Sequence, residues 1–261
     1  MPANYAHYRF GAEMLQQMPG DIRRSVNRFR RLYDVGLHGP DLFYYYNPVI
    51  STRVGALGQK LHQQSGTDFF SRVCRGLRMD SSEAGTAYLY GLLTHYALDS
   101  VCQPILQSAA SEGKLSPVAL EAEFDRFLLE KDGKVPACIQ DLSVHIQLTA
   151  GESATAAKFY SGINDSHIRT AVRNMALITK SFAIAPGIRR ELVKKSTGVF
   201  ARENVGVMIP EEALPGCEAV DQALMDGYEQ AKALFPVLQM QISALMTYNA
   251  PLGQEFDKSF G

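Results

Sequence analysis

Apolar residues recur every three or four positions along most of the chain, and the strict alternation that is typical of strands is scarce. Within residues 4–18, for example, Ala6, Phe10, Met14 and Met18 fall on one side of a predicted helix. The same periodicity predicts further helices over residues 22–33, 54–64, 68–77, 83–103, 118–131, 153–160, 165–183, 186–195 and 218–248. The pattern therefore predicts an all-α fold.

Residues 87–99 form the most apolar of these segments, and their side chains are apolar nearly all the way round the predicted helix. His95 and Asp99 are the exceptions, and their spacing of four residues places them on one face. A carboxylate buried in such a helix is costly unless it is paired or bound to a metal. Two interpretations follow: a His–Asp hydrogen bond inside a core, or two ligands of a zinc ion.

A segment of unusual composition spans residues 36–48. Gly39-Pro40 and Asn47-Pro48 are turn signals, so the segment is predicted to be irregular. Its aromatic residues, 43–46, indicate a loop that packs on the core and contributes to function. The aromatic side chains can line a ligand pocket or belong to the core. Asp41, which directly follows the Gly-Pro pair, is either a turn residue or a ligand held on a rigid bend.

Residues 133–136, Gly-Lys-Val-Pro, mark the end of a first part of the chain. Residues 1–135 hold nearly all the candidate ligands and are predicted to form a helical core with a metal site. Residues 136–261 contain two histidines, His145 and His167, and no cluster of ligand-type residues. This second part is predicted to pack on the first as a C-terminal helical part, so that the two form one continuous all-α unit.

The composition narrows the possible partners and location. Of 261 residues, 46% are hydrophobic and 20% are charged, with a net charge of −1, so no affinity for nucleic acid is expected. No apolar run is long enough to span a membrane, and the N-terminus lacks the pattern of a secretory signal. A cytoplasmic location is therefore expected, with unconventional export as the alternative. The four scattered cysteines are expected to be reduced thiols. Nothing in the sequence indicates the oligomeric state.

Several short motifs occur in one order along residues 4–135. They are His7 within HYRFG, Asp41 within GLHGPDLFYYYNP, His62 within LH, His95 and Asp99 within YLYGLLTHYALDS, and Glu121 just before EFDRFLLEKDG. In this order they resemble the bacterial zinc-dependent phospholipase C family. The resemblance implies a compact multi-helix domain that holds a cluster of up to three zinc ions.

The resemblance also implies roles for individual residues. Asp41, His62, His95 and Asp99 match the ligands of one zinc ion, Asp99 bridges to a second zinc ion that His7 also binds, and Glu121 matches the last ligand of another. The implied reaction is hydrolysis of a phospholipid or a small phosphoester by a metal-bound water, which Asp41 orients or deprotonates. The aromatic run 43–46 is a candidate contact for a choline-like cation.

The chain departs from the family at two expected histidines. Gln103 and Pro117 stand at those positions, and neither glutamine nor proline is a good zinc ligand. One zinc site is therefore the most secure of the one to three that the resemblance allows. The departures favour an alternative function, a non-catalytic, metal-stabilised helical binding domain with a degenerate zinc cluster. A phosphohydrolase of the HD type ranks lower, because the chain has no adjacent His-Asp pair.

Overall fold

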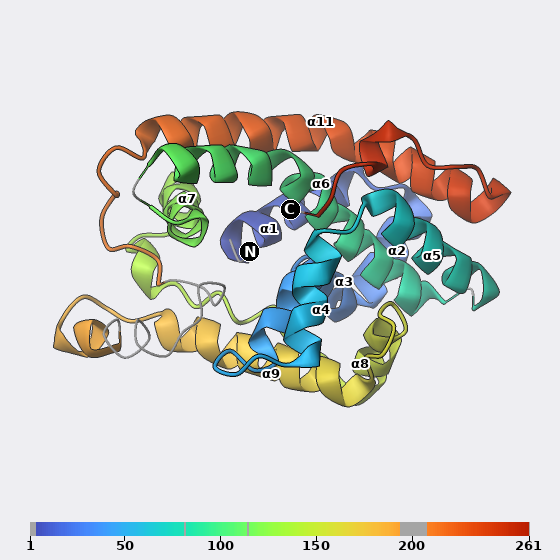
Figure 1. Ribbon diagram of the computed structural model, residues 1–261, viewed down its shortest axis with the longest axis horizontal. Helices are drawn as coiled ribbons and strands as arrows, with labels where there is room; N and C mark the ends of the chain where they lie inside the picture. The colour runs from blue at the N-terminus through green and yellow to red at the C-terminus, as the bar shows by residue number, and fades with distance from the viewer. Residues whose placement is uncertain (1–3, 81, 114, 194–207, 261) are drawn as a thin grey trace.

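The computed structural model describes residues 4–80, 82–113, 115–193 and 208–260, and it confirms the all-α prediction (Figure 1). The elements are α1 (Asn4–Gln17), α2 (Gly20–Arg28), α3 (Arg30–Gly36), η1 (Gly39–Tyr45), α4 (Arg53–His62), α5 (Gly66–Met79), α6 (Glu83–Glu112), α7 (Pro117–Lys131), η2 (Ala137–Ile139), α8 (Ala150–Ala157), α9 (Asp165–Phe182), α11 (Glu218–Tyr248) and η3 (Gln254–Phe256). Within the described ranges, no helix is both long and apolar enough to cross a membrane.

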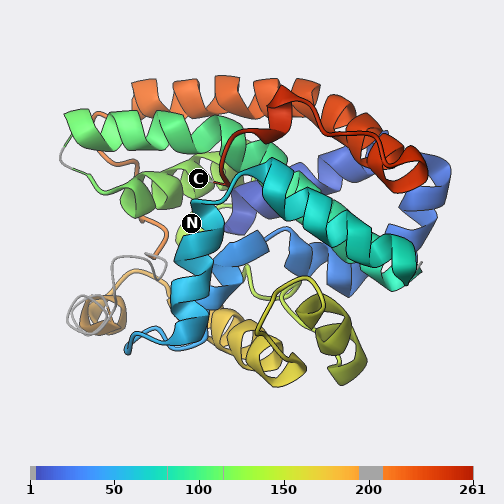
Figure 2. The same ribbon diagram turned by 45° about the vertical axis from the view of Figure 1, so that its right-hand side comes forward.

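Helix α6 lies at the centre of the molecule. Ser82 caps its N-terminus, and every residue from Ala87 to Ser100 is buried, as the continuous apolar run predicts. Helices α1, α2, α3 and α11 pack around α6. In both ribbon views α11 runs along one side, whereas α8 and α9 lie on the opposite side of the molecule (Figures 1 and 2). One hydrophobic core includes residues from both halves of the chain.

The predicted end of this central helix, near Pro104, is wrong, because α6 continues to Glu112. Proline has no backbone N–H, so Pro104 cannot donate to the carbonyl of Ser100 one turn earlier. The ammonium group of Lys258 donates to that carbonyl instead, at 3.2 Å. A side chain from the C-terminal end of the chain therefore satisfies the backbone group that proline leaves open within the helix.

Three other predicted elements differ in detail. The predicted helix 22–33 is two helices, α2 and α3, which are separated at Phe29, a residue with non-helical dihedral angles. The irregular segment 36–48 contains the 3₁₀ helix η1. Helix α5 begins at Gly66, two residues before the predicted start, and Ser65 caps it. The predicted helix 186–195 extends at its C-terminal end outside the described residues.

Two glycines allow α3 and α6 to approach each other closely. A Cβ atom on Gly91 would lie 2.4 Å from the carbonyl oxygen of Tyr33, and one on Gly36 would lie 2.9 Å from that of Tyr88. The chain then turns into η1 through Gly39, whose φ of 45° favours glycine and whose Cβ would overlap the His95 ring at 2.4 Å. These contacts hold η1 directly against α6.

We predict that Gly91→Ala destabilises the protein by about 1–3 kcal/mol, because the added methyl group has no space between α3 and α6. Gly76→Ala on α5 is the matched control. No atom lies within 4 Å of its Cβ position, so it should stabilise the helix by about 0.5–1 kcal/mol. Urea denaturation of both variants measures the difference. A neutral Gly91→Ala would contradict the close packing.

Candidate metal centre

Three elements bring four ligand-type side chains together. His7 comes from α1, Asp41 from η1, and His95 and Asp99 from successive turns of α6. One nitrogen or oxygen atom from each residue lies within 4.8 Å of the others, and all four residues are buried. No side chain among them is more than 3% exposed. We call this group the His/Asp cluster. Imidazole nitrogen and carboxylate oxygen are ligands that suit zinc and related divalent cations.

The ring of His95 is oriented by the chain that enters η1. Its Nδ1 lies 3.1 Å from the carbonyl oxygen of Leu37, which can only accept a hydrogen bond, so Nδ1 carries the proton. The Nε2 atom then faces Oδ2 of Asp99 at 3.2 Å. Neither atom has a hydrogen-bond partner among the described residues. Two facing acceptor atoms require a proton or a cation between them.

His7 contacts the other oxygen of the Asp99 carboxylate. Its Nε2 lies 3.2 Å from Oδ1 of Asp99, and its ring stacks on the ring of His95 with 4.5 Å between centroids. Its Nδ1 is buried and makes no hydrogen bond within the described ranges. Two stacked imidazoles thus contact the two oxygens of one carboxylate. Three buried polar atoms of this group have no hydrogen-bond partner among the described residues. Such unsatisfied atoms are costly in a core and suit a bound cation.

The members of the His/Asp cluster shift one another's pKa values. Burial lowers the pKa of His7 below its ordinary value. Burial also acts against protonation of His95, but the neighbouring Asp99 carboxylate outweighs it and raises the pKa of His95. The two imidazoles in turn hold the pKa of Asp99 well below its usual range despite its burial. Asp99 is therefore ionised at neutral pH, as a metal ligand must be.

His62 lies beside the cluster and contacts one of its members. Its Nε2 is 2.8 Å from Oδ1 of Asp41, and its Nδ1 is 2.8 Å from the carbonyl oxygen of Gly58. The hydroxyl of Tyr44 lies 3.2 Å from the same Nδ1. His62 is not one of the four residues whose donor atoms converge within 4.8 Å. In the described structure His62 therefore orients the Asp41 carboxylate through this contact, outside the group of converging donor atoms.

Glu121 is also buried, and its carboxyl group contacts Gln103. The amide nitrogen of Gln103 donates to its Oε1 at 2.9 Å. Burial, together with the nearby carboxylates of Asp99 and Asp41, raises the pKa of Glu121 to about 8. A small cavity of about 20 Å³ is lined by Glu121, Gln103, His7 and Asp99. Gln103 thus provides a hydrogen-bond donor next to Glu121 where the family resemblance expects a histidine ligand.

Pro117 and the aromatic run have mainly structural positions. Pro117 is the first residue of α7, and Ser116 caps that helix. Phe43 and Tyr45 are buried, with Phe43 edge-on to Tyr160 at 4.7 Å. Tyr44 is the member of the run that reaches a candidate site residue, through His62.

A second pair of histidines was not predicted from the sequence. His38 and His145 are both buried, and their Nε2 atoms lie 2.9 Å apart. Burial lowers the pKa of His145 to about 3 and, with the neighbouring imidazole, lowers that of His38 well below its ordinary value. The two neutral rings share one hydrogen bond. Their separation along the chain left no sequence signal for this pairing.

Comparison of the chain with protein-family models, with curated proteins and with solved structures gave no match.

We predict that zinc stabilises the wild-type protein and that His95→Gln abolishes this effect. A ligand that binds only the folded state adds roughly 3 kcal/mol when its free concentration is about a hundred times its Kd. The melting temperature should therefore rise by about 5 °C or more with zinc in the wild type, but not in His95→Gln. His167→Gln, at the start of α9, is the control and should keep the shift. An equal shift in all three proteins would show that His95 is only a core residue.

We predict that Glu121→Gln flattens the pH dependence of stability in protein kept in a chelator. The pKa of Glu121 is about 8 in the folded state, above an unfolded value near 4.3, so folding favours its protonated form. The free energy of unfolding should therefore fall as pH rises from about 4 to about 8. Denaturant titrations at several pH values measure the slope for both proteins. Identical slopes would show that Glu121 does not ionise within the core.

Proposed function

We propose that this protein is a metal-dependent phosphoester hydrolase of the zinc-dependent phospholipase C type. The observation that carries the proposal is the His/Asp cluster, in which two imidazoles and two carboxylates converge in the core with their donor atoms within 4.8 Å. The unsatisfied atoms of His7, His95 and Asp99 support a bound cation. The nitrogen and oxygen donors support zinc as that cation.

In this proposal His7, His95, Asp99 and Asp41 hold the metal. A bound zinc ion supplies a Lewis acid that polarises the phosphoester and activates water at neutral pH. The carbonyl of Leu37 fixes the ring of His95 so that Nε2 faces the centre. Asp99 supplies the negative charge that a divalent cation requires.

Asp41 is the proposed base, with His62 as its positioning residue. The imidazole of His62 contacts the Asp41 carboxylate through one ring nitrogen and the carbonyl of Gly58 through the other. Because the carbonyl fixes the Nδ1 proton, the Nε2 of His62 can exchange a proton with Asp41 and keep the carboxylate oriented. The His62 imidazole is one of the groups that lower the pKa of Asp41 despite its burial, so the carboxylate is ionised at neutral pH. The proposed substrates are phospholipids or small phosphoesters.

A second candidate function is supported by the contact between Gln103 and Glu121. This hydrogen bond occupies the place where a further metal ion would bind in the family. The residues of the His/Asp cluster are at most 3% exposed, which is typical of a structural site rather than an open catalytic one. The alternative proposal is therefore a non-catalytic helical domain that one metal ion stabilises and that binds a ligand or partner.

Hydrolysis of bis-p-nitrophenyl phosphate and p-nitrophenylphosphocholine distinguishes the two candidates. We expect zinc-dependent turnover in the wild type and a loss of about 100-fold or more in Asp41→Asn, because the general base is removed. Asp226→Asn, an exposed substitution on α11, should keep full activity. Zinc content per chain is measured on the same samples by plasma mass spectrometry.

The three possible outcomes of these measurements distinguish the hydrolase from the binding domain. Turnover that depends on zinc and on Asp41 supports the hydrolase. Stoichiometric zinc without turnover supports the metal-stabilised binding domain. A chain that binds no zinc after reconstitution would reduce the His/Asp cluster to a buried hydrogen-bond network and contradict both candidates.

A further inference from the structure

Two adjacent apolar side chains are exposed in the turn that joins η1 to α4. Val49 is 57% exposed and Ile50 is 63% exposed. The Oδ1 atom of Asn47 accepts hydrogen bonds from the backbone N–H of Val49 at 3.2 Å and of Ile50 at 3.0 Å, which fixes the shape of the turn. The turn therefore presents two large hydrocarbon groups to solvent, although their burial would be favourable.

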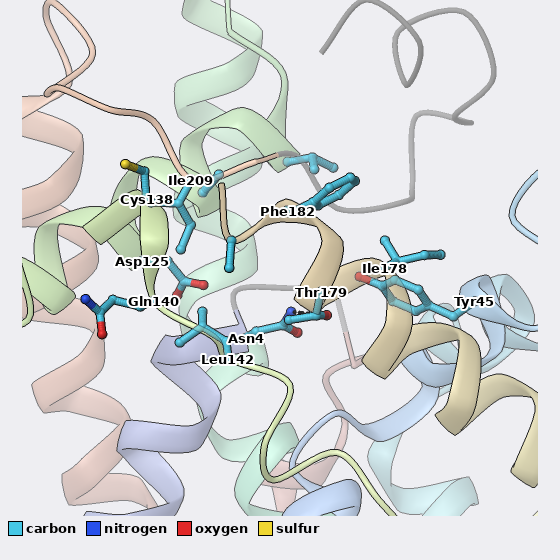
Figure 3. Close-up of a pocket in the computed structure, with 13 residues that line it drawn as sticks. Asn4, Tyr45, Asp125, Cys138, Gln140, Leu142, Ile178, Thr179, Phe182 and Ile209 are labelled. Atoms are coloured by element: carbon cyan, nitrogen blue, oxygen red, sulfur yellow. Dashed lines mark hydrogen bonds between the residues drawn. The ribbon is translucent and has the colours of Figure 1, made fainter. Parts of the chain in front are cut away.

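Helix α9 lies beside this turn in both ribbon views (Figures 1 and 2). The side chain of Asn174 makes the connection, because its Nδ2 donates to the carbonyl oxygen of Tyr45 at 3.0 Å and to that of Tyr46 at 3.1 Å. Figure 3 shows Ile178 on the same inner face of α9, close to Tyr45. The opposite face of α9 is directed away from the core.

This outer face of α9 combines one apolar side chain with two basic ones. Arg173, Leu177 and Lys180 are four and three residues apart, so they form one row along the helix surface. All three are exposed, Leu177 to 55%. Together with the turn and with the first residue of α4 they form a surface that we call the α9 edge, which consists of Val49, Ile50, Arg53, Arg173, Leu177 and Lys180.

The basic residues of the α9 edge are available to a partner. Arg53, Arg173 and Lys180 form no ion pair with any of the described residues. The carboxylate of Asp141 is within electrostatic reach of Lys180, but it accepts hydrogen bonds from Ser143. No aspartate or glutamate occurs in residues 42–67 or in residues 166–190, which contain the whole edge. This surface is therefore positively charged although the net charge of the chain is −1.

Exposed apolar side chains next to unpaired basic groups suit the surface of an anionic membrane. The headgroups supply negative charge, and the boundary between headgroups and acyl chains accepts hydrocarbon. We propose that the α9 edge docks on an anionic phospholipid surface, with Val49 and Ile50 inserted below the headgroups. Arg53, Arg173 and Lys180 then contact the lipid phosphates. A nucleic acid would satisfy the basic groups but would leave the apolar turn in water. The proposal does not depend on the metal or on phosphoester hydrolysis.

Cosedimentation with vesicles tests the electrostatic part. We expect the full chain to bind mixed phosphatidylcholine–phosphatidylserine vesicles about tenfold or more tightly than phosphatidylcholine vesicles, with less preference at high salt. Arg173→Gln combined with Lys180→Gln should weaken binding about tenfold or more, because each basic residue near such a surface contributes about fivefold. Arg23→Gln combined with Arg24→Gln removes two exposed charges from α2 and should have no effect. Samples with zinc and with a chelator separate binding from hydrolysis.

Tryptophan fluorescence tests the insertion of the turn. The chain contains no tryptophan, so a single introduced one reports its own surroundings. With mixed vesicles, the emission of Ile50→Trp should shift to the blue, and brominated acyl chains should quench it. Met240→Trp is the matched control, because Met240 is 64% exposed but lies on α11, on the opposite side of the molecule (Figures 1 and 2). Its emission should not change.

Polar substitutions at the same two positions measure the apolar contribution. Ile50→Asn should weaken binding to mixed vesicles about tenfold or more, because the isoleucine side chain is no longer removed from water. Met240→Asn should bind as the wild type does. Circular dichroism verifies that all variants are folded.

Three results would overturn the proposal. Absence of binding to mixed vesicles, both with zinc and with a chelator, would show that the α9 edge takes no lipid surface. Equal losses in the two pairs of charge variants would make the attraction a property of the total charge. Binding without any change in the emission of Ile50→Trp would leave the turn in water and assign the basic residues to another polyanion, such as a nucleic acid. None of these results depends on turnover, so the hydrolase proposal can fail while this one stands.

Discussion

The contact between α3 and α6 is the constraint on which the candidate metal centre depends. Gly36 and Gly91 let the two backbones approach to a distance that no side chain would allow. Because of that approach, the carbonyl of Leu37 reaches the ring of His95, and Asp41 enters the core one turn later. The polar cluster is therefore positioned by backbone contacts, which are stiffer than contacts between long side chains.

The burial of the His/Asp cluster has an energetic cost, and this cost favours the binding of a cation. The His/Asp cluster places ionisable groups in the most apolar part of the molecule, where each uncompensated charge is strongly destabilising. Protons can compensate part of the cost, as between His62 and Asp41. The atoms of His7, His95 and Asp99 that have no partner among the described residues remain. A divalent cation would satisfy several of them at once, which makes metal binding and folding two aspects of one equilibrium.

Much of this arrangement could be predicted from the sequence because it depends on local spacing. The four-residue spacing of His95 and Asp99 determines that they share a helix face, and the apolar residues between them determine that this face is buried. The Gly-Pro bend before Asp41 indicates a fixed turn. Whether His62 or Glu121 joins the metal was not predictable in this way, because it depends on side-chain partners such as Gln103.

Features that join distant parts of the chain left no local signal. The hydrogen bond from Lys258 to Ser100 allows α6 to pass through Pro104, and it links two residues that are far apart in the sequence. The same holds for the His38–His145 pair. Propensity rules describe what a segment does alone, and they fail where a distant side chain supplies the missing hydrogen-bond partner.

Helix α7 holds the first turn of α1, the helix that carries His7. Asp125 from α7 accepts from the N–H groups of Tyr5 and Ala6, and a carboxylate at a helix N-terminus is stabilised by the helix dipole. The same turn directs His7 toward the His/Asp cluster. The capping interaction thus fixes the position of His7 relative to Asp99. Helix α7 therefore contributes to the metal centre through the backbone of α1 as well as through Glu121.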